Sequence, residues 1–362
     1  MIHYSALSEG SAMSKWILFV VFSLFLTIAV PDSAADFAHP NMSYNTGQGH
    51  PSCSNITLEQ LSTPMCDAAM ASLPVPDVTP LPADFGIIKD VKFIRFNTTE
   101  VPVYNAPNGN LIENMTAGYT YLAPINFIEG WAELSPGRWV SMANVTMGNP
   151  SAFSGVLVNT MPMPFAWILW DVEAVKSPNG FADKENGLYR RYQLVNIFAT
   201  INVNGWNWYL IGPGHWTNQK NVSMVYPKAP AEFEGRWVGV DLYEQNIVAY
   251  EDDKPVMASL ISSGLKEPKW ETNTGTFIIQ ERVESGVMAG FEGAEDYYWL
   301  DLVPYAQYFD GAISLHGIYW HDSFGYPHSH GCVNLSVTDA KWLYEWMTDG
   351  TTVYVYDSGP SS

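Results

Sequence analysis

Four of the eight histidines and one of the three cysteines lie within the stretch LHGIYWHDSFGYPHSHGCVNLS, residues 315–336. Histidine nitrogen and cysteine sulfur are the ligands that Zn²⁺ prefers, so a zinc site is the first hypothesis to test. The chain has no paired CxxC and no HExxH motif. Its glycines and Pro327 predict a loop, rather than a strand that would place His328, His330 and Cys332 on one face. We therefore expect no metal and no other cofactor.

A cysteine nucleophile with a histidine base fits these residue types better. A thiol reacts as thiolate, and a nearby imidazole or helix N-terminus lowers its pKa. Cys332 lies four residues before Ser336, the expected N-cap of a helix, and His316 ends the β-like run AISLHG. Gly331 allows a tight turn whose amides can face a substrate oxyanion. The pattern thus predicts acyl transfer through a Cys–His pair.

The elements that must position this pair are mostly strands. The run from Gly235 alternates apolar and polar residues and contains two turn signals, Glu-Gln-Asn and Glu-Asp-Asp-Lys-Pro, which predict two hairpins. Further strands are expected at TGTFIIQERV, YYWLDLVPYAQYF, AISLHG and TTVYVYD. Only SVTDAKWLYEWM predicts a helix clearly, with Ser336 and Asp339 forming a variant capping box.

Together, the HG and SHGCVN motifs resemble the signature of the L,D-transpeptidase (YkuD-type) catalytic domain. The resemblance covers residues 235–357 and includes the VDLYEQNIVAYEDDKPV hairpin and TNTGTF. It implies a mainly β fold with the cysteine loop beside a small helix. The chain departs from the family pattern at His328, where many relatives carry Arg, and at Asn273, where Pro is usual. A neutral His at 328 cannot reproduce the bidentate grip of Arg on a carboxylate.

The resemblance also implies residue roles. Cys332 is the expected nucleophile, His316 its base, and the Gly317 carbonyl the group that orients the imidazole. Oxyanion or substrate-binding roles are implied for the amides of Gly331 and Cys332, the Tyr308 hydroxyl, His330, Ser329 and Asn334. For Tyr308 and Asn334, local hydrogen bonding within the fold is an equal alternative.

By the same resemblance, the substrate is a peptidoglycan tetrapeptide stem. Cys332 would displace the terminal D-Ala, and an amine of a neighbouring stem would resolve the thioester and cross-link the wall. Water as acceptor would make the enzyme an L,D-carboxypeptidase, and a protein amine would make it an anchoring transferase. A non-catalytic wall-binding adaptor and a zinc amidase are the alternatives from other classes.

The N-terminal region predicts export. One Lys precedes the apolar run Trp16–Val30 and the small residues Ser33–Ala35, as in a secretory signal peptide over residues 1–35. A single membrane anchor is the alternative, but fifteen apolar residues are short for a span. We expect an extracytoplasmic protein, in the periplasm or cell wall. Residues 36–88 form a Pro-rich lead-in, with a helical candidate at Leu58–Ser62 and a disulfide expected between Cys53 and Cys66.

An internal repeat follows. VYNAPNGN resembles AVKSPNGF, and EGWAELSPGRWVSMANVTM resembles NGWNWYLIGPGHWTNQKNVSM. Short β-like runs broken by Asn-Gly and Pro-Gly turns predict two small β units, over residues 89–150 and 151–228, which resemble bacterial SH3-like domains. Trp139 and Trp216 occupy matching positions. They form either a wall-binding groove or part of the core, and we favour the core.

Composition restricts the functional classes that remain. Hydrophobic content of 47% supports packed cores, and a net charge of −20 without a basic run argues against nucleic-acid binding. The expected fold is mainly β: two SH3-like barrels followed by a catalytic domain with one short helix. The expected partners are peptidoglycan stem peptides, with the repeats as a second contact to the wall.

Overall fold

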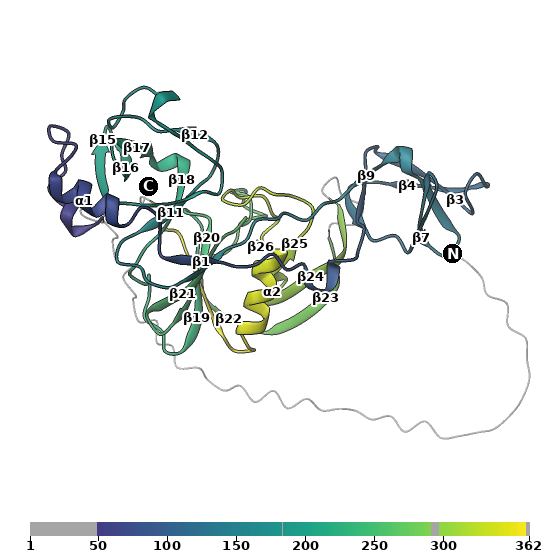
Figure 1. Cartoon of the computed structure of the whole chain (residues 1–362). Coiled ribbons are helices and arrows are strands. Elements are labelled where there is room, and N and C mark those ends of the chain that lie inside the picture. The colour runs from purple at the N-terminus through teal and green to yellow at the C-terminus, as the bar shows by residue number, and fades with distance from the viewer. Residues whose placement is uncertain (1–48, 183, 291–296, 360–362) are drawn as a thin grey trace, which may run out of the picture. The chain divides into compact units, whose positions relative to one another are not determined.

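The structure is a computed structural model that describes residues 49–182, 184–290 and 297–359. The fold is mainly β, as expected, and two α-helices occur among the described residues (Figure 1). The expected signal peptide, residues 1–35, lies outside these ranges. Within them, no helix is long and apolar enough to cross a membrane.

Sheet A forms one layer of the catalytic region. Its order is β1-β10-β21-β20-β19-β27-β22. The strands are Val78–Pro80 (β1), Val156–Val158 (β10), Lys254–Leu260 (β21), Asn246–Glu251 (β20), Arg236–Asp241 (β19), Thr352–Tyr356 (β27) and Gly275–Ile278 (β22). Both predicted hairpins form, β19–β20 and β20–β21, with Gln245 and Asp252 in the left-handed conformation at the turns. Strand β27 pairs with β19 in parallel.

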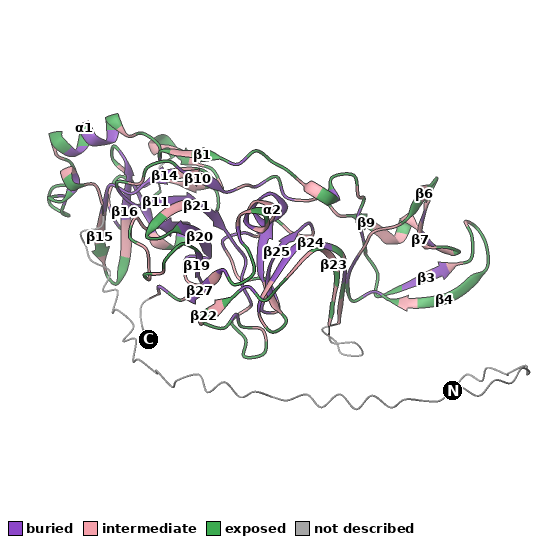
Figure 2. Cartoon of the chain, turned by 90° about the horizontal axis from the view of Figure 1, so that it is seen from below, coloured by how far each residue is buried: buried purple, intermediate pink, exposed green. Residues whose placement is uncertain are grey.

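Sheet B carries the candidate site. Its order is β26-β25-β24-β5-β2-β9, with β23 also paired to β24. The strands are Val333–Ser336 (β26), Ile313–Ile318 (β25), Tyr298–Asp310 (β24), Tyr119–Leu122 (β5), Ile94–Phe96 (β2), Val145–Met147 (β9) and Glu281–Gly290 (β23). The buried faces of sheets A and B share one hydrophobic cluster, which includes Val238, Leu315 and Leu343. Figure 2 shows this buried interior around β19, β20, β24, β25 and α2.

Helix α2 (Val337–Trp346) begins at the predicted position. The Asp339 N–H donates to Ser336 Oγ at 3.1 Å, and Ser336 Oγ donates to the Asp339 carboxylate at 2.7 Å. Asp339 also accepts from the Gly155 N–H and the Ser259 hydroxyl, both at 2.7 Å. The cap therefore ties the helix that follows the cysteine loop to the edge of sheet A.

The two repeats show the same order of elements. Sheet C of the first unit comprises Leu111–Thr116 (β4), Glu100–Tyr104 (β3), Arg138–Ser141 (β8), Trp131–Ser135 (β7) and Asn126–Ile128 (β6). The second unit comprises Phe165–Ile168 (β11), Val172–Glu173 (β12), Leu188–Tyr189 (β13), Leu194–Asn196 (β14), Ala199–Val203 (β15), Trp206–Gly212 (β16), His215–Asn218 (β17) and Val222–Val225 (β18). In each unit, two hairpins lead through a 3₁₀ turn into a strand that pairs with the first strand of the unit, β9 with β2 and β18 with β11. The assignment of both units as SH3-like stays a prediction.

The lead-in is more ordered than its composition suggests. The Cys53–Cys66 disulfide is present. The helical candidate at Leu58–Ser62 is wrong; the helix is α1, Pro64–Ser72, because Thr63 caps it and Pro64 occupies its first position. The one helix expected in the catalytic domain is α2. Both disulfide cysteines pack in one cluster with Trp216, which is buried, as is Trp139, so the core placement of this pair is confirmed.

Candidate active site

His316 lies on β25, and Cys332 lies directly before the parallel strand β26. His316 pairs with Asn334 in the β25–β26 register, which places Ser314 beside Cys332 two residues earlier. Cys332 Sγ lies 3.8 Å from Ser314 Oγ and 3.8 Å from the Ala312 carbonyl oxygen. Alternate residues of a strand share a face, so Ser314 and His316 lie on one face of β25. Cys332 and Asn334, also two residues apart, lie on the same side of the neighbouring segment.

His316 is a neutral, oriented imidazole. It is 2% exposed, and burial lowers its pKa to about 4, with the hydrogen bond to Gly317 opposing that shift. Its Nδ1 lies 3.1 Å from the Gly317 carbonyl oxygen, which can only accept, so Nδ1 carries the proton and Nε2 is the basic atom. A side chain at Gly317 would meet Pro304 and Ala340, so glycine lets the strand approach both β24 and α2.

The Cys332 thiol does not have the lowered pKa expected from the sequence. Burial raises its pKa, and the Ser314 N–H and hydroxyl only partly oppose the rise. The expectation placed the N-terminus of α2 close to the sulfur, but β26 separates them by four residues, about 13 Å of extended chain. Helix-dipole effects fall off within the first turn. The resting pair is therefore a thiol beside a neutral imidazole.

The cysteine loop, residues 329–332, is held by hydrogen bonds to the Gly331 backbone. The Gly331 N–H donates to Ser329 Oγ at 3.1 Å, and Ser329 Oγ donates to the Cys332 carbonyl. The Gly331 carbonyl accepts from Thr272 Oγ1 at 2.7 Å. Gly331 has φ +124°, which a side chain would strain. The Gly331 amide is engaged within the loop, so the Cys332 amide and the Tyr308 hydroxyl remain as the oxyanion donors that the sequence predicts.

Asn334, the backbone partner of His316, contacts a second histidine through its side chain. Its carboxamide nitrogen lies 3.1 Å from His321 Nε2, while His321 Nδ1 accepts from the Ser323 N–H at 3.0 Å. Burial lowers the pKa of His321 to about 3, and His328 and His316 add to the effect. The His321 and His328 rings are 4.1 Å apart. Among the described residues, no group of His, Cys, Asp or Glu side chains is arranged to hold a metal ion.

Aromatic side chains form the rim of the site. His330 stacks on Tyr298, with ring centroids 5.4 Å apart, and meets Trp270 edge-on at 4.7 Å. Tyr308 pairs with Ser314 across β24 and β25. Burial raises the pKa of Tyr298 and of Tyr308, and a Cys332 thiolate, when it forms, adds to both shifts. Both phenols therefore stay protonated and can donate hydrogen bonds near the sulfur.

All eight sequence-predicted site residues lie on β24, β25 and β26 or in the cysteine loop. Sequence reasoning missed Ser314, Thr272 and Tyr298. Alternation in AISLHG could have placed Ser314 on the same face as His316, and Thr272 opens the TNTGTF motif. No local signal indicated Tyr298. His328, the departure from Arg, lies beside His321, and desolvation lowers its pKa, which favours the neutral ring.

Both β units contact the segment that joins His316 to the cysteine loop, residues 319–328. From the first unit, Phe93 stacks on Tyr319 and the Tyr121 hydroxyl donates to the Trp320 carbonyl at 3.1 Å. From the second, the Tyr192 hydroxyl donates to the Asp322 carbonyl at 2.9 Å, and Trp170 stacks on Tyr326. The units thus restrain the segment on which the site depends.

Part of the chain is similar to known proteins. Residues 235–355 match the family model described as the L,D-transpeptidase catalytic domain. A Bacillus subtilis (strain 168) protein named "Putative L,D-transpeptidase YciB" is 31% identical over 127 residues, which cover 33% of this chain and 64% of that relative. The chain thus spans just under two thirds of its curated relative.

Two solved structures are similar over part of the chain. The L,D-transpeptidase of Xylanimonas cellulosilytica is 27% identical, with a TM-score of 0.31, and the match covers 36% of this chain and 65% of that one. The catalytic domain of the Enterococcus faecium enzyme is 26% identical, with a TM-score of 0.31, and the match covers 35% of this chain and all of that one. On the family match and the curated relative together, residues 235–355 of this chain resemble the L,D-transpeptidase catalytic domain.

Proposed function

We propose that the protein is an exported cysteine acyltransferase that acylates Cys332 with a peptidoglycan tetrapeptide stem, releases D-Ala, and transfers the stem to an amine. The observation that carries the proposal is the buried imidazole of His316, neutral and held by Gly317, on the strand beside Cys332. An imidazole of this kind is suited to remove the proton from a thiol whose own pKa is raised.

In the first half-reaction, His316 Nε2 takes the thiol proton as sulfur attacks the carbonyl carbon that precedes the terminal D-Ala. The Cys332 N–H and the Tyr308 hydroxyl stabilise the resulting oxyanion. As the tetrahedral intermediate collapses, the C–N bond breaks and the imidazolium gives its proton to the leaving amine. D-Ala departs and a thioester remains. An imidazolium whose pKa is lowered by burial is a strong acid for this step.

In the second half-reaction, an amine of a neighbouring stem attacks the thioester. His316 Nε2 removes the amine proton, the C–S bond breaks, and the proton returns to sulfur. Water as the acceptor would release a tripeptide, and a protein amine would give an anchored protein. These three outcomes share the same acyl-enzyme. The acceptor is therefore identified from the product and not from the first half-reaction.

Intact mass spectrometry tests the proposal. The mature protein, Cys332→Ala and His316→Gln are incubated with a disaccharide-tetrapeptide or with a carbapenem, an acylating agent expected for this family. We expect an adduct on the wild type, none on Cys332→Ala, and slow formation on His316→Gln. Absence of any adduct, with a thiol no more reactive than a free model thiol, would contradict the proposal. Product masses then separate cross-linked dimer, tripeptide and protein conjugate.

A further inference from the structure

A tyrosine of the first β unit contacts the segment that follows the candidate base. Tyr121 lies on β5, which pairs with β2 of its own unit and, in parallel, with β24 of the site. Its side chain is 3% exposed, and its hydroxyl donates to the Trp320 carbonyl at 3.1 Å. Tyr121 therefore connects the first β unit to the chain just after β25, the strand that carries His316.

Trp320 lies beyond the part of the chain that the strand ladder holds. Strand β25 ends at Ile318, and residues 320–324 make no backbone-to-backbone hydrogen bond with any described residue. Side chains hold this stretch instead, and the Tyr121 hydroxyl is the donor to the Trp320 carbonyl. A polar group that loses its partner in a buried place costs about 1–3 kcal/mol. Loss of this hydroxyl is therefore expected to let Trp320 move toward water.

The Trp320 indole is the contact between this hydrogen bond and the base. Its ring centroid lies 5.9 Å from the His316 ring and 6.2 Å from the Tyr121 ring. Tyr319 meets the indole edge-on at 4.9 Å and itself stacks on Phe93 of the first β unit at 3.5 Å. These rings form a continuous series of contacts from the first β unit to the imidazole.

The imidazole needs more than its own hydrogen bond to stay aligned. His316 Nδ1 lies 3.1 Å from the Gly317 carbonyl oxygen, which fixes the tautomer. A single hydrogen bond leaves a ring free to tilt about it, whereas packing against a second ring restricts that motion. His316 is 2% exposed and Trp320 is half-buried, so we expect the indole to shield the imidazole from water. A displacement of about 1 Å in a reacting group can cost about 100-fold in rate.

We propose that Tyr121 is a positioning residue for the candidate base: it holds Trp320 against His316 and so keeps the imidazole dry and aligned with Cys332. The inference rests on the proposed function, because Tyr121 affects the acylation of Cys332 through Trp320. The first β unit thereby takes part in the chemistry, although it lies outside the region of family resemblance.

Other ionisable groups surround the imidazole. Cys332 lies on the neighbouring segment, and His321 lies on the segment that follows β25, where His316 contributes to lowering the His321 pKa. From β24, the Tyr308 phenol interacts with the sulfur, and from α2 the Asp339 carboxylate accepts from its own cap residue. The variants below alter none of these groups, so a change in the His316 pKa reports the hydration of its ring.

The test compares Tyr121→Phe with Tyr104→Phe in the full chain. Each variant loses one phenol hydroxyl from the same unit, but Tyr104 packs against Trp131, with ring centroids 5.2 Å apart. At saturating carbapenem, the first-order rate of Cys332 acylation should fall about three- to tenfold in Tyr121→Phe and less than about twofold in Tyr104→Phe. The half-saturating concentration should change little. Melting curves verify that both variants fold.

A second readout separates positioning from a merely structural role. NMR of labelled histidine gives the titration midpoint of His316, which should rise from about 4 toward 6.5 in Tyr121→Phe because water reaches the ring. The pH midpoint of acylation should rise with it. Trp320→Ala should reproduce both changes. Adding Tyr121→Phe to Trp320→Ala should then change neither further, because the hydroxyl acts through the indole.

Three results would each overturn the inference: an unchanged His316 midpoint in Tyr121→Phe, an unchanged acylation rate in that variant, or an undiminished effect of Tyr121→Phe in the Trp320→Ala background. Absence of acylation in the wild type would instead contradict the proposed function. The NMR midpoint does not require acylation, so it would still show whether Tyr121 keeps the His316 imidazole dry.

Discussion

At the scale of single residues, the base and the nucleophile are both uncharged before reaction. Burial disfavours the imidazolium of His316 and the thiolate of Cys332 alike. In the proposed reaction, proton transfer would then accompany the attack of sulfur rather than precede it. The activation barrier of acylation then depends mainly on the positions of His316 Nε2 and the oxyanion donors. It depends less on the fraction of Cys332 that is thiolate before substrate binds.

The pH dependence of acylation follows from this. His316 must be neutral to act as base, and its pKa is lowered from 6.5 to about 4. We expect the rate of carbapenem acylation to rise with pH with a midpoint near 4 and to be level between about pH 5.5 and 8. Mass spectrometry of the acylated fraction over time gives the rate. A midpoint near 6.5 would show that the imidazole is solvated in the working enzyme.

The residues that could be read from the sequence are those fixed by their neighbours in the chain. Cys332, His316 and Gly317 belong to short sequence motifs, and Ser336 with Asp339 forms the capping pattern that predicts the start of α2. The thiol pKa could not be read in this way. Sequence distance from the helix suggested proximity, whereas the intervening residues form an extended strand.

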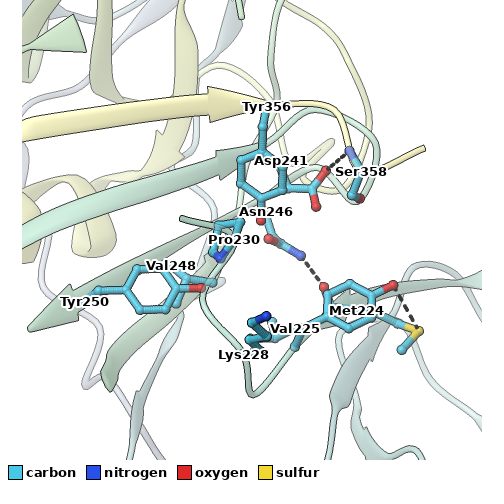
Figure 3. A pocket seen from close by; sticks show the side chains of 11 residues that line it. Met224, Val225, Lys228, Pro230, Asp241, Asn246, Val248, Tyr250, Tyr356 and Ser358 are labelled. Atoms are coloured by element: carbon cyan, nitrogen blue, oxygen red, sulfur yellow. Dashed lines mark hydrogen bonds between the residues drawn. The ribbon is translucent and has the colours of Figure 1, made fainter. Parts of the chain in front are cut away.

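At the scale of elements, the turn between β19 and β20 buries two carboxyl groups against the second β unit. Figure 3 shows Asn246 directed at Met224 and Asp241 at Ser358 around a space of only about 10 Å³. The Asn246 amide donates to the Met224 carbonyl, and the Met224 N–H donates to Glu244, both at 2.7 Å. Burial raises the pKa of Glu244 to about 8, and the neighbouring Asp241 adds to the rise.

This shift links stability to pH. The folded state holds the Glu244 proton up to about pH 8, whereas the unfolded chain releases it near 4.5, so the free energy of unfolding falls as pH rises between these values. Glu244→Gln cannot ionise at this position. Between about pH 5.5 and 8, its free energy of unfolding, measured with urea, should therefore fall by about 1–3 kcal/mol less than that of the wild type. The exposed Glu234→Gln is the control. Parallel curves for wild type and Glu244→Gln would contradict the assignment.

A second element-scale prediction concerns residues 319–328. Asp322 receives hydrogen bonds from Ser151, Arg191 and Tyr192, and its ion pair with Arg191 is largely exposed. Exposed ion pairs contribute little, so its role is to restrain the segment. Asp322→Ala should slow acylation several-fold with a small loss of stability, because His316 and the cysteine loop flank the segment. Asp349→Ala, also exposed, is the control; equal rates in both variants would refute the restraint.

At the scale of the whole molecule, the two sheets that carry the candidate site extend beyond residues 235–357. Sheet A takes β1 from the lead-in and β10 from the stretch assigned to the second repeat, and sheet B continues into β5, β2 and β9. These strands are three or four residues long, too short to show a period-two pattern. Their partners are distant in sequence, so neither the pairing nor the extent of the domain could be read from the chain.

We therefore expect a fragment of residues 235–357 to fold poorly. Its loss of β1 and β10 exposes the edge of β21, and loss of β5 exposes that of β24, which favours edge-to-edge aggregation. Circular dichroism and gel filtration should show an aggregated or weakly structured fragment, whereas residues 49–359 give a cooperative transition. A monomeric 235–357 fragment with the thermal midpoint of the longer chain would refute this.

The pairing of β1 with β10 also bears on how the chain came to be assembled. Pro80 and Val156 are ladder partners, and the Leu81 N–H donates to the Gly155 carbonyl at 2.9 Å, so the chain leaves sheet A and returns to it at adjacent positions. Everything between them is the first β unit. One recombination event at this point would add or remove that unit without altering the strand order of sheet A. The unit that such an event would exchange and the unit defined by strand pairing in sheet B therefore have different boundaries.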